Sequence, residues 1–176
     1  MADIGQFLKT HSCFISTFKE TSYDTSNDVP LCQDALNSVI NFDAIVENRY
    51  PNAQQRPKSF DALYIDGVDI YCVEFKNQKP SCISSTDIRE KLEEGKKELD
   101  TLLSNENIQK NDYDFTYCVV YQNCLEPRER YKCDIKAKIL FDLSKYKGKL
   151  VKNVITRNVD FFTKQFKKNI SKELDC

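Results

Sequence analysis

Residues 59–77 constrain the fold of this chain more than any other stretch. Two runs, residues 60–65 and 69–75, are rich in the aromatic and β-branched side chains that favour β-strands. Between them lies Asp66-Gly67, a dipeptide typical of tight hairpin turns. We therefore predict an antiparallel β-hairpin at this position.

The register of this hairpin decides which side chains meet. If residues 66 and 67 form the turn, Asp61 pairs with Cys72 and lies diagonal to Glu74. If the turn shifts by one residue, Asp61 faces Glu74 directly. In both registers Asp61, Glu74 and Lys76 share one face, because side chains alternate with period two. A three-residue loop would break this arrangement.

Two neighbouring carboxylates repel each other, and one normally takes up a proton unless a cation lies between them. Their oxygens are hard ligands suited to Mg²⁺ or Mn²⁺. A lysine beside such a metal can orient a water or stabilise charge on a phosphate. Asp61, Glu74 and Lys76 therefore predict a centre for phosphodiester hydrolysis. The alternative is an ordinary cross-strand charge pair between Asp61 and Lys76 on a solvated face.

The remaining elements follow from the spacing of apolar residues. We predict a short helix within residues 1–20, amphipathic helices over residues 31–50, 84–105 and 159–170, and strands over residues 115–122 and 135–143. Ser84 can cap the second amphipathic helix, with Asp87 three residues on. The strand at 115–122 is a nearly continuous apolar run, which indicates a central position covered on both faces. This order predicts a single α/β domain with a mixed central sheet flanked by helices.

The pattern resembles the PD-(D/E)xK nuclease superfamily, which has the restriction-endonuclease-like fold. Its hallmark is an acid on one strand and Glu-x-Lys on the next, after a helix that often carries another Glu. Asp61 matches the first acid, residues 74–76 match Glu-x-Lys, and Glu47 matches the helix glutamate. The resemblance covers about residues 31–122.

This resemblance implies a nuclease that depends on Mg²⁺ or Mn²⁺. Asp61, Glu74 and the backbone carbonyl of Phe75 would bind the metal, and Lys76 would position the nucleophilic water. Glu47 would bind the metal directly or through water.

Two features depart from the family pattern. Residues 59–60 are Ser-Phe, where the family has its nominal proline before the acid. The fold core also has three strands before its second helix, and the sequence predicts only two there. A short strand within residues 54–58 could supply the third.

The net charge of −1 conceals an uneven distribution. Residues 125–172 contain 14 Lys and Arg against 5 Asp and Glu, so the C-terminal strand and helix are basic and the rest of the chain is acidic. A basic region beside an acidic centre suits a polyanion partner such as nucleic acid. Within it, Lys145, Lys147 and Lys149 surround a tyrosine and suit contacts with phosphates. Lys91 could reach a scissile phosphate. All four lysines could equally be solvated surface residues.

The eight cysteines include no Cys-x-x-Cys pair, and several lie in apolar runs. The N-terminus lacks the pattern of a secretory signal, and no apolar run is long enough to span a membrane. We therefore expect a cytoplasmic protein with reduced thiols and no structural zinc. His11 invites comparison with viral cap-cleaving endonucleases of the same fold, which place an N-terminal histidine on the metal, but a surface histidine is the simpler interpretation.

Three functions remain open. A DNA-directed nuclease is favoured over an RNA-cleaving toxin or a cap-cleaving type of endonuclease. The third is a non-catalytic binding or immunity protein that keeps the fold as a scaffold. A homodimer is an option for a nuclease of this fold, although the chain contains no dedicated dimerisation segment.

Overall fold

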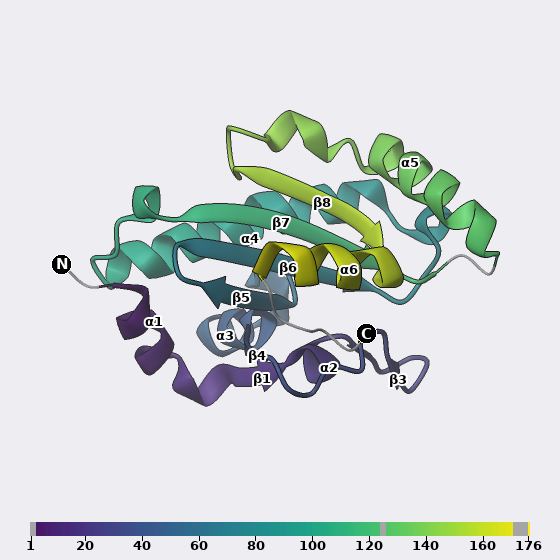
Figure 1. Ribbon diagram of the computed structural model, residues 1–176. Coiled ribbons are helices and arrows are strands. Elements are labelled where there is room, and N and C mark those ends of the chain that lie inside the picture. Colours follow the sequence, from purple (N-terminus) through teal and green to yellow (C-terminus); the bar gives the residue numbers. More distant parts are fainter. Residues whose placement is uncertain (1–2, 124–125, 171–175) are drawn as a thin grey trace.

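The computed structural model describes residues 3–123, 126–170 and 176 (Figure 1). The main sheet contains β1 (Ile15–Thr17), β4 (Ser38–Asn41), β5 (Ala62–Asp66), β6 (Asp69–Lys76), β7 (Asp114–Tyr121) and β8 (Asn153–Asn158), while β2 (Tyr23–Asp24) and β3 (Val29–Pro30) form a separate pair. The α-helices are α1 (Ile4–Thr10), α2 (Phe18–Thr21), α3 (Phe42–Arg49), α4 (Ser85–Asn105), α5 (Arg130–Phe141) and α6 (Val159–Ile170).

The six strands of the main sheet lie in the order β1-β4-β5-β6-β7-β8. The pairs β1–β4, β4–β5 and β5–β6 are antiparallel, whereas β6, β7 and β8 run parallel to one another. The expected α/β class and mixed sheet flanked by helices are thus confirmed. Strands β6, β7 and β8 are parallel and in register. Their last residues, Lys76, Tyr121 and Asn158, therefore lie side by side at the same end of the sheet.

Helices cover both faces of the sheet (Figure 1). On one face, Cys72 and Tyr117 pack in a core with residues of α3, α4 and α5. On the other, Val73 and Cys118 pack with residues of α2 and α6. Successive side chains of β7 point alternately into the two cores. The strand is therefore buried from Phe115 to its end, as predicted for residues 115–122.

The hairpin adopts the second of the two predicted registers. Asp66 pairs with Asp69, so Gly67 and Val68 form the turn. Gly67 has a φ of +61°, the positive value that the first central residue of such a turn requires and glycine accepts without strain. The same register, continued beyond β5, sets Asp61 opposite Glu74.

The helix predicted over residues 31–50 is wrong in its first half. Residues 38–41 form β4, which pairs with both β1 and β5, and helix α3 starts only at Phe42. The side chain of Asn41 accepts a hydrogen bond from the amide of Ala44 and so caps the helix at this point. Leu36, an apolar residue of the predicted helix, is 91% exposed. Pairing with the sheet overrides helical periodicity here.

The strand predicted over residues 135–143 is also wrong, because helix α5 occupies most of this stretch. Its buried side chains, Asp134, Ala137 and Phe141, recur at helical spacing. The strand at this side of the sheet is β8, which the sequence did not predict.

No strand forms within residues 54–58. Residues 53–55 form a 3-10 helix instead, and the main-sheet strands that precede β5 and β6 are β1 and β4. The basic C-terminal region therefore consists of α5, β8 and α6, with residues 125 and 171–175 outside the described part.

Gly95 lies where α4 crosses the ring of Phe60. A Cβ added at Gly95 would stand 2.8 Å from Cδ1 of Phe60. Ala normally favours a helix over Gly by about 1 kcal/mol, but overpacking of a buried contact costs about 1–3 kcal/mol. We therefore predict that Gly95→Ala lowers the free energy of unfolding in urea, while Lys97→Ala on the exposed side of α4 leaves it nearly unchanged. A more stable Gly95→Ala variant would contradict this packing.

The expectation of reduced thiols throughout is wrong. Cys32 and Cys176 form a disulfide, and Cys133 is disulfide-bonded as well. The free cysteines among the described residues are Cys13, Cys72, Cys82 and Cys118. Cys32 belongs to the core beneath α6, so its bond ties the C-terminal residue to that core. In the described part of the chain, every helix is too short or too polar to cross a membrane.

Candidate functional site

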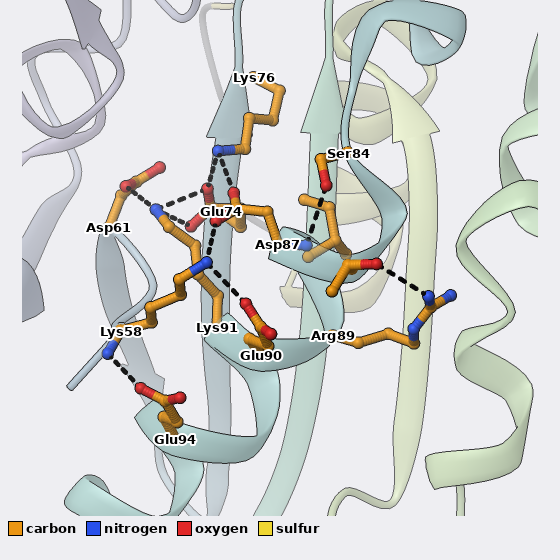
Figure 2. Close-up of polar contacts among 12 residues, drawn as sticks. Lys58, Asp61, Glu74, Lys76, Ser84, Asp87, Arg89, Glu90, Lys91 and Glu94 are labelled. Atoms are coloured by element: carbon orange, nitrogen blue, oxygen red, sulfur yellow. Dashed lines mark hydrogen bonds and ion pairs between the residues drawn. The ribbon is translucent and has the colours of Figure 1, made fainter.

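Asp61 lies just before β5 and is fixed from two sides. Its backbone carbonyl accepts a hydrogen bond from the amide of Phe42 at the start of α3. Its carboxylate oxygen Oδ2 accepts one of 2.6 Å from the amide of Phe75. These bonds orient the carboxylate across the hairpin and leave Oδ1 pointing toward α4 (Figure 2).

Glu74 is the most deeply buried charged residue of the cluster, with no exposed side-chain surface. It follows the apolar residues of β6 on the face that α4 covers, so folding the hairpin against α4 removes its carboxylate from water. Two residues on, the ammonium of Lys76 lies 3.0 Å from Oε1 of Glu74 and 3.1 Å from Oδ2 of Asp87. Asp61, Glu74 and Lys76 thus lie together, as the sequence predicted.

Lys91 on α4 reaches between the two carboxylates (Figure 2). Its ammonium lies 2.8 Å from Oε1 of Glu74 and 3.6 Å from Oδ1 of Asp61. It also donates a 3.0 Å hydrogen bond to Oε2 of Glu74. The helical position four residues after Asp87 explains this placement, because both side chains project from the same side of α4.

An outer group of charges holds the loop before Asp61 against α4. The ammonium of Lys58 lies 2.8 Å from a carboxylate oxygen of Asp87 and 2.7 Å from one of Glu90. The backbone amide of Lys58 donates a hydrogen bond to the carboxylate of Glu94. Asp87 therefore connects Lys58 with Lys76. Ser84 caps α4 by accepting a hydrogen bond from the amide of Asp87, as predicted.

Burial and mutual repulsion shape the ionisation of this cluster. Burial and the charge of Glu74 raise the pKa of Asp61 well above its usual value. Burial also raises the pKa of Glu74, although both lysines oppose this. Burial disfavours the charged form of Lys91, but the charges of Glu74 and Asp61 outweigh it and raise the pKa of Lys91 overall. Paired carboxylates with displaced pKa values in one cluster are typical of functional sites.

Glu47 does not join this cluster. Its side chain is 58% exposed and forms an ion pair with Arg56. Asp43, one turn earlier on α3, lies closer: its negative charge contributes to the raised pKa values of Asp61 and Lys91, and its carboxylate accepts a hydrogen bond from Ser59. The resemblance pointed to Glu47, whereas Asp43 is the acid of α3 whose charge acts on Asp61.

Replacing Asp43 and Glu47 one at a time tests which of these two acids acts on the site. We expect Glu47→Ala to bind Mn²⁺ like the wild type, because its carboxylate faces solvent and Arg56. Asp43→Asn should weaken Mn²⁺ binding, because it removes a negative charge beside Asp61. Calorimetric titration with Mn²⁺ measures both. The assignment fails if Glu47→Ala weakens binding and Asp43→Asn does not.

The other predicted residues lie elsewhere. Lys145, Lys147 and Lys149 are exposed in the segment leading into β8, at the opposite end of the parallel strands from Lys76. His11 is 8% exposed, lies at the end of α1 and contacts Phe7 and Glu106 at the far end of α4. It therefore lies away from Asp61 and Glu74.

The cluster suits a divalent cation in its donor chemistry. Within the described residues, no three His, Cys, Asp or Glu side chains are grouped as metal ligands. Mg²⁺, however, is usually bound through one or two carboxylates and keeps several waters. Oε1 of Glu74 is the oxygen best placed for this role, because it is buried and already paired with the two cationic groups of Lys76 and Lys91. Oδ1 of Asp61 faces the same point.

Comparison of the chain with family models, with curated proteins and with solved structures gave no match.

Proposed function

We propose that this protein is a metal-dependent nuclease with a restriction-endonuclease-like core, and that Asp61, Glu74 and Lys76 form its active site. The observation that carries the proposal is the meeting of two carboxylates, fully buried Glu74 and largely buried Asp61, with Lys76 and with Lys91 of α4 on one face of the hairpin. Removing two carboxylates and two ammonium groups from water is costly even when they pair with one another. A cluster retained at this cost is better explained by chemistry than by stability.

The order of elements around the site supports the same proposal. Helix α3, the hairpin β5–β6, helix α4 and the parallel strand β7 follow one another as in the PD-(D/E)xK pattern. Strand β4 supplies a third strand before α4, although it precedes α3.

The residues divide the work of phosphodiester hydrolysis between them. Asp61 and Glu74 would hold a Mg²⁺ or Mn²⁺ ion, with the carbonyl of Phe75 as a further oxygen ligand. Such an ion supplies Lewis-acid charge beside the phosphate and lowers the pKa of water. Lys76, 23% exposed and held by Glu74 and Asp87, orients the attacking water. The water oxygen then bonds to phosphorus as the bond to the leaving sugar oxygen breaks.

Cleavage of labelled nucleic acids tests this proposal. Single- and double-stranded DNA and RNA are incubated with the protein in Mn²⁺, Mg²⁺ or EDTA. We expect cutting of at least one substrate in Mn²⁺ and none in EDTA, and the substrate that is cut names the nucleic acid. Absence of cutting in every lane, with no rise of the melting temperature in Mn²⁺, would instead favour a binding scaffold.

A further inference from the structure

Lys91 stands where a metal ion bound to both carboxylates would have to lie. Its ammonium contacts Oδ1 of Asp61 and Oε1 of Glu74, at 3.6 and 2.8 Å. Because Oδ2 of Asp61 is bound to the amide of Phe75, Oδ1 is the oxygen of Asp61 that meets Oε1 of Glu74 at this point. The ammonium and a divalent cation cannot share this position, since both are positive and both need the same oxygens.

We propose that Lys91 is a built-in counter-cation that must leave the two carboxylates before a divalent metal binds, so that the charge of Lys91 sets the metal affinity of the site. This inference rests on the proposed function and specifies how its metal site is regulated. Lys91 fits the role because its side chain, 17% exposed, reaches solvent at the site, whereas Glu74 is fully buried. The flexible stem of a lysine also allows its ammonium to move while the helix stays in place.

The second half of the inference concerns where the ammonium goes. Once it leaves Asp61 and Glu74, Lys91 is a cation beside a metal and needs an anion. The phosphate of a bound nucleic acid provides one at the same place. Metal and nucleic acid would then favour each other's binding through Lys91, because coupling between two ligands is reciprocal.

Measuring Mn²⁺ affinity in lysine variants tests the inference directly. Lys91→Met removes the charge and keeps a chain of similar length, whereas Lys91→Arg keeps the charge. Lys58→Met is the matched control, because Lys58 pairs with Asp87 and Glu90 and not with the two metal-binding carboxylates. Calorimetric titration with Mn²⁺ alone gives each affinity, and the melting temperature without metal confirms that each variant is folded.

We expect Lys91→Met to bind Mn²⁺ at least about five-fold more tightly than the wild type, within the usual range of such couplings. Lys91→Arg and Lys58→Met should not bind more tightly. Lys91→Met should also cleave more slowly at saturating Mn²⁺, because the released ammonium is missing from the phosphate.

The outcomes separate this inference from the proposed function. Equal or weaker Mn²⁺ binding by Lys91→Met overturns the inference and leaves a metal-binding wild type intact. Mn²⁺ binding by Lys91→Met but not by the wild type supports the inference and contradicts a metal-dependent wild-type enzyme. If neither protein binds Mn²⁺, both proposals fail. If Lys91→Met does not fold, Lys91→Gln replaces it, with the same expected direction.

Discussion

Replacing Glu74 by Gln should abolish metal-dependent cleavage. The substitution keeps the shape of the side chain but removes the charge and one of the carboxylate oxygens at the buried centre of the cluster. We expect the cleavage rate in Mn²⁺ to fall by about 10²–10³-fold, the usual cost of losing one electrostatic contact in an active site. The Mn²⁺-induced rise in melting temperature should also disappear.

Folding should survive this change, because the raised pKa of Glu74 means that burial already favours a neutral group at this position. Glu90→Gln is the matched control. Glu90, on α4, also pairs with a lysine, Lys58, but forms no ion pair with the residues that bind the metal. Cleavage at the wild-type rate by Glu74→Gln would show that the activity comes from another site.

Replacing Lys76 by Met should separate chemistry from metal binding. Lys76 contacts Glu74 and Asp87 through its ammonium but supplies no metal ligand. We therefore expect a loss of cleavage of about 10²-fold, the order of magnitude that misplacing a reacting group costs. The Mn²⁺ affinity should stay within a few-fold of the wild type.

The paired measurement is a cleavage time course beside a Mn²⁺ titration of the same preparation. Asp61→Ala serves as the contrasting variant, since it should lose both properties. If Lys76→Met still cleaves at a normal rate, another group must orient the water. Lys91 would then be the first residue to replace.

The local pattern of the hairpin was readable from sequence, and most of the site follows from it. Period-two alternation and a two-residue turn place Asp61, Glu74 and Lys76 on one face in either of the two registers considered. Lys91 was predicted from sequence only as a lysine that could reach a scissile phosphate. Its contact with both carboxylates depends on how α4 crosses the hairpin, which no local pattern specifies.

The errors have a common physical origin. At residues 38–41 an apolar stretch compatible with a helix pairs instead with two strands of the sheet. In α5 the opposite happens, because Ala137 and Phe141 pack against the core at helical spacing although the sequence alternates like a weak strand. Short apolar segments allow both structures, and the tertiary contacts decide between them.

The positions of the two acids on α3 also depend on the whole fold. Asp43 and Glu47 lie one turn apart on α3, so helical periodicity puts both on the same side. Only the position of the helix start at Phe42 and the path of the loop carrying Ser59 bring Asp43 toward the site and leave Glu47 with Arg56. These are long-range features of the fold.

The fate of solvent oxygen tests metal-dependent hydrolysis at this site most directly. The nucleic acid that is cut in Mn²⁺ is digested in water enriched in ¹⁸O, by the wild type and by Glu74→Gln, and the product ends are analysed by mass spectrometry. Attack by an oriented water predicts one ¹⁸O in the terminal phosphate of the wild-type products and no product from the variant. Unlabelled or cyclic phosphate ends, or equal products from both proteins, would contradict it.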